Sequence, residues 1–189
     1  MQDLIIRDVR LVGPRPAGDE VLEVDERTPL SWPLAWVVDK SAKYGGDVRV
    51  RIMGHGAGPV LYSRQLPDVM FGANEEAAVS PGGCGMYFCA ECLSLKTVDQ
   101  FNRWRGKVKN IDLVGCAVAY ITAGYEGKSG DGNFLCMKLA QTTQAYVKAA
   151  TFAQPYDFRH MSFFRGWVGT VLTYGPSGAV VKVENSPPM

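Results

Sequence analysis

The stretch VRVRIMGHGAGPV, residues 48–60, alternates apolar and charged side chains and then stops at His55, which is flanked by two glycines. Such alternation is typical of a β-strand with two unlike faces. A second stretch, KNIDLVGCAVAY at residues 109–120, ends its apolar run on Cys116, directly after a glycine. We therefore expect two strands that each deliver a chemically reactive side chain at a glycine-rich turn.

Three segments predict helices between or after these strands. SWPLAWVVDKSAKYGG predicts a helix over about 32–44 with Ser31 as its N-cap, because a proline follows in the first turn and glycines follow the end. TVDQFNRWRG predicts a helix in which Thr97 and Gln100 form a capping box. NFLCMKLAQTTQ predicts a helix capped by Asp131.

Strands alternate with these helices along the chain. Apolar runs at residues 4–12, 21–24 and 145–151 predict further strands. Because strand–helix–strand crossovers are right-handed, this order predicts an α/β fold whose mostly parallel central sheet carries helices on its faces. The tail WVGTVLTYGPSGAVVKV, within about residues 166–184, predicts a C-terminal β-hairpin around Gly-Pro-Ser-Gly.

Composition and charge restrict the class of protein. The chain has 189 residues, 47% of them hydrophobic, which suits a single domain over residues 1–189. Its 20 Lys and Arg residues against 19 Asp and Glu leave a net charge of +1, so we expect no nucleic-acid partner. Charges interrupt the apolar start MQDLIIRDVRLVG and no run could span a bilayer, so we expect a cytoplasmic protein or one exported without a cleaved N-terminal signal. Five irregularly spaced cysteines favour free thiols.

The histidine and the cysteine together indicate nucleophilic catalysis. Ligands of parallel sheets bind outside the carboxyl ends of the strands, where both residues fall. A thiol attacks as the thiolate, and a nearby imidazole can take its proton. We predict that His55 and Cys116 form a dyad, with the backbone amides of Gly56 and Cys116 stabilising an oxyanion and His55 protonating the leaving amine. No third, acidic member is apparent from the spacing.

The motifs RIMGHG and IDLVGC resemble the paired motifs of caspase-like (clan CD) cysteine peptidases, in which one apolar strand ends in His-Gly and a later one ends in the nucleophilic cysteine. The similarity covers about residues 47–151 and extends to the autoprocessing protease domains of large bacterial toxins and the related His-Gly/Gly-Cys domains of bacterial adhesins. It implies a caspase-like three-layer sandwich in which His55 is the general acid/base and Cys116 attacks a peptide bond. The chain would then be a bacterial effector or autoprocessing module that acts on a peptide or protein.

The same resemblance suggests a regulator. The toxin domains are activated by inositol hexakisphosphate, a ligand that needs clustered basic groups. The run RWRGKVK places Arg103, Arg105, Lys107 and Lys109 close together. Charge runs at a helix end are also typical of solvated surface, so both readings stay open.

Other patterns carry less chemistry. GYEGKSGDG lacks the first glycine of a phosphate-binding loop, because Thr122 stands in its place. Cys84, Cys89 and Cys92 have no second pair at metal-binding spacing, so we predict neither a metal nor a resident cofactor. His160 stands among aromatic residues and is expected to pack or face solvent.

The alternative to an enzyme is an interaction module. A protein with the same scaffold could use the long irregular loop at residues 57–83 and the C-terminal hairpin to hold a partner without catalysis. The sequence leaves the oligomeric state open.

Overall fold

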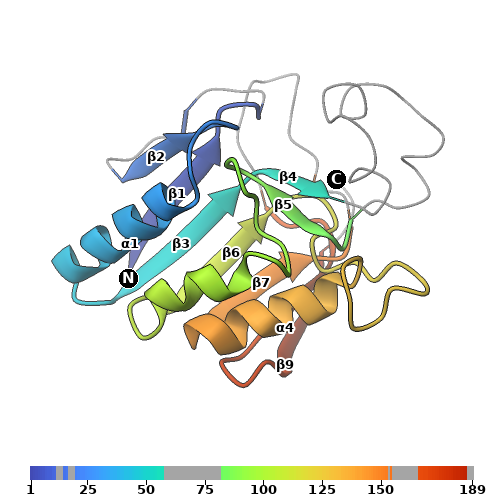
Figure 1. The fold of residues 1–189 in the computed structure, drawn as a ribbon. Coiled ribbons are helices and arrows are strands. Elements are labelled where there is room, and N and C mark those ends of the chain that lie inside the picture. Colours follow the sequence, from blue (N-terminus) through green and yellow to red (C-terminus); the bar gives the residue numbers. More distant parts are fainter. Residues whose placement is uncertain (12–14, 17–19, 58–81, 153, 155–165, 187–189) are drawn as a thin grey trace.

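The computed structural model describes residues 1–11, 15–16, 20–57, 82–152, 154 and 166–186. Most of the predicted loop at 57–83, and His160, lie outside the described residues. Figure 1 shows a central sheet with helices packed against it. The strands of that sheet, in spatial order, are β2 (Val21–Val24), β1 (Gln2–Asp8), β3 (Val48–Met53), β6 (Asn110–Val114), β7 (Tyr146–Ala150), β8 (Gly169–Tyr174) and β9 (Val180–Ser186).

The sheet is mixed and mostly parallel. From β2 to β7 each strand pairs with its neighbour in parallel, whereas β8 runs antiparallel to β7, and β9 antiparallel to β8. A separate two-stranded ladder, formed by β4 (His55–Ala57) and β5 (Gly85–Tyr87), lies beyond the carboxyl end of β3 (Figure 1). The predicted α/β class and mostly parallel sheet are therefore confirmed.

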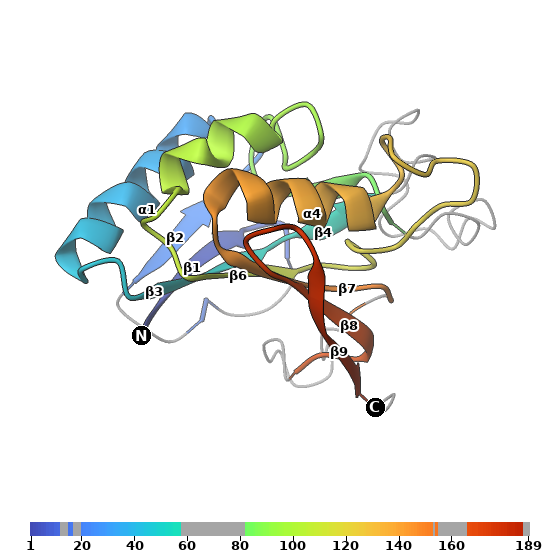
Figure 2. The same cartoon turned by 90° about the horizontal axis from the view of Figure 1, so that it is seen from below.

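The helices of the described chain cover one face of the sheet, as Figure 2 shows. They are α1 (Ser31–Lys43), the 3-10 helix η2 (Val98–Trp104) and α4 (Gly132–Thr143). The connections from β2 to β3, β3 to β6 and β6 to β7 all advance in the same direction across the sheet, so right-handed crossovers place their helices on the same side. Among the described residues, no helix is long and apolar enough to cross a bilayer.

The core fills the space between the sheet and these helices. Val50 and Ile52 of β3 are fully buried on the helix side. The rings of Phe101 and Trp104 in η2 meet edge to face at 5.0 Å, and the Trp104 indole N–H donates to the carbonyl of Leu34 in α1 at 3.1 Å. This bond anchors η2 to α1, because a buried indole N–H needs an acceptor.

Two helix starts differ from the predictions, and one agrees. The Asp131 carboxylate accepts from the amide of Phe134 at 2.9 Å, which confirms the predicted cap of α4. Ser31 is the first residue of α1 rather than its N-cap, so that prediction was wrong. The N-cap is Leu30, whose amide donates instead to a carboxylate oxygen of Glu91 at 2.7 Å. A distant side chain thus satisfies the helix end that a local serine was expected to cap.

The predicted capping box at Thr97 was also wrong. The hydroxyl of Thr97 donates to the carbonyl of Cys92 at 2.8 Å and accepts from the amide of Ser94 at 2.9 Å, and it makes no cap to the helix. It therefore stabilises the preceding turn, and the segment that follows is a 3-10 helix.

Candidate active site

The ends of β3 and β6 form one continuous backbone contact. The strands are neighbours with Met53 opposite Val114, and the amide of Gly54 donates to the carbonyl of Val114 at 3.2 Å. A Cβ atom built on Gly56 would lie 1.7 Å from the carbonyl oxygen of Cys116, a distance that no side chain tolerates. The two predicted turns therefore lie against each other, and glycine is required for the contact.

His55 is half-buried and bonds to the segment that follows β1. Its imidazole makes a hydrogen bond to the backbone of Arg10, while its Nε2 atom is buried without a hydrogen-bond partner among the described residues. The bond to Arg10 therefore runs through Nδ1, which leaves the Nε2 lone pair free. Burial lowers the pKa of His55, and the charge of nearby Asp8 and the bond to Arg10 only partly offset this effect. The imidazole is thus a neutral base at pH 7.

Asp8 and Arg10 support this histidine, and the sequence reasoning missed both. Asp8 is fully buried at the end of β1, and its carboxylate accepts from the Arg10 amide at 2.9 Å, from Nε at 2.9 Å and from Nη2 at 2.5 Å. These bonds fix the turn whose backbone holds the imidazole. No signal for them was present in the sequence, because the strand was predicted over residues 4–12 and its pairing with β3 is known only from the structure.

Cys116 bonds in the opposite direction, toward the segment that follows β7. Its thiol donates to the carbonyl of Gln154 at 3.7 Å, and burial raises the pKa of the thiol. The side chain of Gln154 is itself fixed, since it donates to the carbonyl of Val168 at 2.9 Å and accepts from the same residue's amide at 2.9 Å. The resting cysteine is a protonated thiol in a rigid backbone frame.

The structure brings the two predicted turns together and gives the two side chains different partners. Among the described residues no hydrogen bond joins His55 to Cys116. Ala117, directly after the cysteine, adopts a left-handed φ of 49°, and its amide donates to the carbonyl of Phe152 at 2.8 Å. The cysteine is therefore held on a sharp turn between the ends of β6 and β7.

Among the described residues, the two amides predicted to bind an oxyanion have no backbone acceptor. Met86, opposite Gly56 in the ladder, uses its own N–H and C=O on Leu93 at 3.0 and 2.9 Å. The amides on either side of Cys116 donate to other carbonyls, but within the described chain its own amide has no backbone acceptor. Both amides are therefore without a backbone partner in the part of the chain that the structure describes.

Burial disfavours the thiolate form of the other cysteines near the site as well. Burial raises the pKa of Cys84, and raises that of Cys89 to about 11 and of Cys92 to about 12. The part of the chain that the structure describes contains no group of three His, Cys, Asp or Glu side chains able to hold a metal ion.

The basic run at residues 103–109, for which inositol phosphate binding and solvated surface both stay open, has side chains in different surroundings. Arg103 and Lys107 line a hollow against α1, whereas Lys109 bonds to the carboxylate of Asp47 at 2.8 Å. Lys109 therefore does not line the hollow that Arg103 and Lys107 share.

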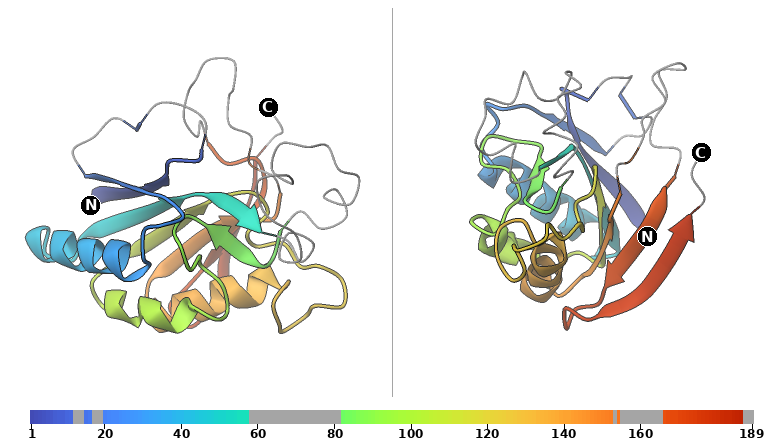
Figure 3. Two further views of the ribbon diagram at one scale, coloured as in Figure 1. Left: turned by 45° about the horizontal axis from the view of Figure 1, so that its top comes forward. Right: turned by 90° about the vertical axis from the view of Figure 1, so that its right-hand side faces the viewer.

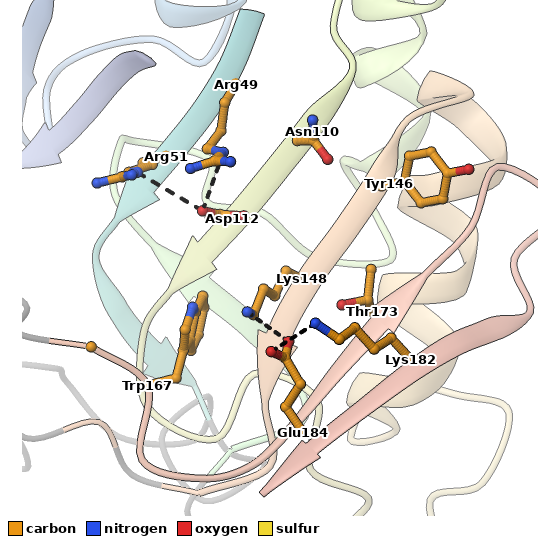
Figure 4. A pocket seen from close by; sticks show the side chains of 11 residues that line it. Arg49, Arg51, Asn110, Asp112, Tyr146, Lys148, Trp167, Thr173, Lys182 and Glu184 are labelled. Atoms are coloured by element: carbon orange, nitrogen blue, oxygen red, sulfur yellow. Dashed lines mark hydrogen bonds and ion pairs between the residues drawn. The ribbon is translucent and has the colours of Figure 1, made fainter. Parts of the chain in front are cut away.

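A separate cavity of about 430 Å³ lies on the face of the sheet opposite the helices (Figure 4). Its cations are paired: Arg51 lies 3.8 Å from Asp112, and Lys148 and Lys182 lie 2.7 and 3.0 Å from Glu184. Burial raises the pKa of Asp112 despite the two arginines beside it. The cavity is lined by Arg49, Arg51, Asn110, Asp112, Tyr146, Lys148, Gly166, Trp167, Thr173, Lys182 and Glu184. None of these residues belongs to the turns of His55 and Cys116.

No protein-family model, curated protein or solved structure matches this chain. Its function is therefore inferred from its own geometry. That geometry provides a neutral base, a protonated thiol on an adjoining turn, and two amides that have no backbone partner among the described residues.

Proposed function

We propose that this chain is a cysteine peptidase of the caspase-like type, in which His55 activates Cys116 for attack on a peptide bond. One observation carries the proposal. The imidazole of His55 is neutral, its Nδ1 bonds to the backbone of Arg10, and its buried Nε2 has no hydrogen-bond partner among the described residues. The turn that carries it packs backbone to backbone against the turn of Cys116. A buried nitrogen without a partner costs stability, so its persistence supports a role in proton transfer.

The proposed reaction starts from two neutral groups. When substrate binds, the thiol of Cys116 turns from the carbonyl of Gln154 and gives its proton to Nε2 of His55. The thiolate attacks the peptide carbonyl carbon, and the amides of Gly56 and Cys116 stabilise the resulting oxyanion. The imidazolium then protonates the leaving amine, which leaves a thioester on Cys116. Water then gives a proton to His55 as its oxygen attacks the thioester carbonyl; the C–S bond breaks, the carboxylic acid product leaves, and the imidazolium returns its proton to the sulfur of Cys116.

Asp8 and Arg10 take the place of a third catalytic member in this proposal. The backbone of Arg10 orients the imidazole, and the Asp8 carboxylate favours the imidazolium that forms during proton transfer. Neither residue touches the substrate, so both are positioning residues.

The finer assignment belongs to the same proposal. The chain would be a caspase-like three-layer sandwich whose described helices supply one outer layer. It would act on a peptide or protein, as a bacterial effector or an autoprocessing module.

An irreversible peptidyl ketone probe tests the enzyme proposal. We expect it to alkylate Cys116 in the wild-type chain, and labelling to fall at least tenfold in Cys116→Ala and in His55→Ala. Cys89→Ala is the matched control, because it removes a nearby buried thiol and should leave labelling unchanged. Peptide mass mapping identifies the modified residue. Equal labelling of all three variants, or labelling unaffected by His55→Ala, would contradict the proposal.

A non-catalytic interaction module is the second candidate. It is favoured by the raised pKa of Cys116 and by the bond of its thiol to Gln154 rather than to His55. In that case the wild-type chain takes up the probe no faster than Cys116→Ala, although both are folded.

A further inference from the structure

β9 (Val180–Ser186) is the outer strand of the sheet and is exposed along its whole length. It pairs with β8 on one side, and the right-hand view of Figure 3 shows no described element beyond it. None of its residues is buried, and Val180, Val181 and Val183 are 44, 57 and 57% exposed. An edge strand with unpaired backbone groups and exposed apolar side chains is a template for another strand.

The side chains of β9 divide between the two faces of the sheet. Lys182 and Glu184 point to the open face, where they line the cavity of Figure 4. Val183 lies between them in sequence and therefore points to the helix side, where it stands opposite Leu172 of β8. The edge thus carries a cation and an anion on one face, with an exposed valine midway between them on the other.

We propose that a second copy of this chain adds to β9 in an antiparallel arrangement, with a two-fold axis through Val183. In this register Lys182 stands opposite Glu184 of the second copy, and Glu184 stands opposite the second Lys182. Two opposite-charge pairs then form on the open face, and the two Val183 side chains meet on the helix side. The strand is self-complementary, as a two-fold interface requires.

In other antiparallel pairings of two β9 strands, the helix sides and the open faces of the two copies can also be aligned. Those pairings do not place opposite charges against each other. An axis through Lys182 sets two ammonium groups opposite each other, and an axis through Glu184 sets two carboxylates opposite each other. An axis through Val181 falls at the irregularity in the β8–β9 register and leaves the charges unpaired. Like charges directly opposite each other destabilise a strand pair, so Val183 is the favoured centre.

The described contacts leave room for the added pairing. The Lys182 side chain is 62% exposed although it bonds to Glu184 at 3.0 Å. Glu184 also holds Lys148 at 2.7 Å, so its side chain is already directed over the open face. The interface would join two sheets into one. It is independent of the peptidase proposal, because no residue of the candidate active site takes part.

Sedimentation velocity of the full chain over a range of concentrations tests the interface. We expect a dimer for the wild type and at least a tenfold weaker dimer for Lys182→Glu and for Glu184→Lys, since each change sets like charges opposite each other twice. Mixing these two variants should restore a dimer, because every pair in the heterodimer is again opposite in charge. Lys128→Glu makes the same charge change on an exposed loop and should leave the wild-type dimer intact.

Val183→Lys provides a second variant that keeps both charged residues. It places two ammonium groups at the axis and should also give a monomer, with a melting temperature by circular dichroism close to that of wild-type monomer. A wild type that is monomeric at all concentrations would overturn the proposal. So would a Glu184→Lys chain as dimeric as the wild type, or a mixture of the two charge variants that stays monomeric.

Discussion

The candidate active site and the open-face cavity handle polar groups in opposite ways. At the ends of β3 and β6, His55 keeps a buried Nε2 that has no hydrogen-bond partner in the described part of the chain, beside a thiol whose charged form is disfavoured by burial. On the open face the charged groups mostly neutralise one another, although Asp112 is also largely buried; even Arg51, whose Nε has no hydrogen-bond partner among the described residues, pairs with Asp3 through Nη2 at 2.8 Å. Compensated surface charges are inexpensive, and by themselves they do not indicate a catalytic site. An unsatisfied buried base is costly, and so it is the better guide to chemistry.

The largest effect is expected where the two turns touch. In Gly56→Ala the new methyl group would overlap the carbonyl of Cys116, and a backbone atom in a buried turn cannot move aside freely. We expect a loss of about 3 kcal/mol or more in the free energy of unfolding, measured with urea.

Gly106→Ala is the matched control for this change. Nothing lies within 4 Å of its Cβ position, although its φ of 69° disfavours alanine. It should cost about 1 kcal/mol, through the backbone alone. A Gly56→Ala chain as stable as Gly106→Ala would show that the two turns do not depend on close contact.

Substitution of two carboxylates, Asp8 in the candidate site and Asp112 on the open face, should have an intermediate effect on the free energy of unfolding. Asp8→Asn leaves Arg10 without its buried partner and should lower the free energy of unfolding by about 2 kcal/mol. Asp112→Asn should change it by less than about 1 kcal/mol, because the arginines lie 3.8 and 4.0 Å away and burial already disfavours the charge. Urea unfolding of both variants measures the difference. Equal losses of unfolding free energy in the two variants would show that the two carboxylates contribute equally to stability, against this prediction.

The smallest effect is the pH dependence that His55 adds. Its pKa in the folded chain is lowered by burial below the usual value near 6.5, so the unfolded state binds more protons as the solution becomes acidic. The contribution to stability is present above that usual value and is lost as pH falls below it. We therefore expect wild type to lose more stability than His55→Gln between pH 7.5 and 5.5 in urea titrations. Parallel pH profiles would show that the imidazole titrates normally.

The sheet was readable from sequence because its signals are local. Alternation over VRVRIM and NIDLV identifies β3 and β6 within each stretch, and the Asp131 cap needs only Phe134 three residues later. The same alternation indicates that one face of the sheet is left uncovered by helices. Strands covered on both faces are apolar throughout, whereas β3 and β6 carry Arg, Asn and Asp at every second position. The starts of α1 and η2 were mispredicted because Glu91 and Cys92, which lie outside those helices, provide the actual partners.

The candidate site could be predicted only in part from the sequence, because some of its residues are positioned by partners that are distant in the chain. His55 and Cys116 follow predicted strands, so their position at one edge of the sheet could be expected. Asp8, Arg10 and Gln154 could not be placed, because no local rule states which turn a side chain at the end of a strand will reach.

The sequence by itself determined that two reactive side chains follow two glycine-broken strands, since a period of two and a missing Cβ are properties of neighbouring residues. Only the tertiary structure decided which atoms they meet: Nδ1 of His55 meets the turn after β1, and the Cys116 thiol meets the segment after β7. Those partners come from distant parts of the chain, and they are brought together by strand order and register, which burial of the whole sheet determines.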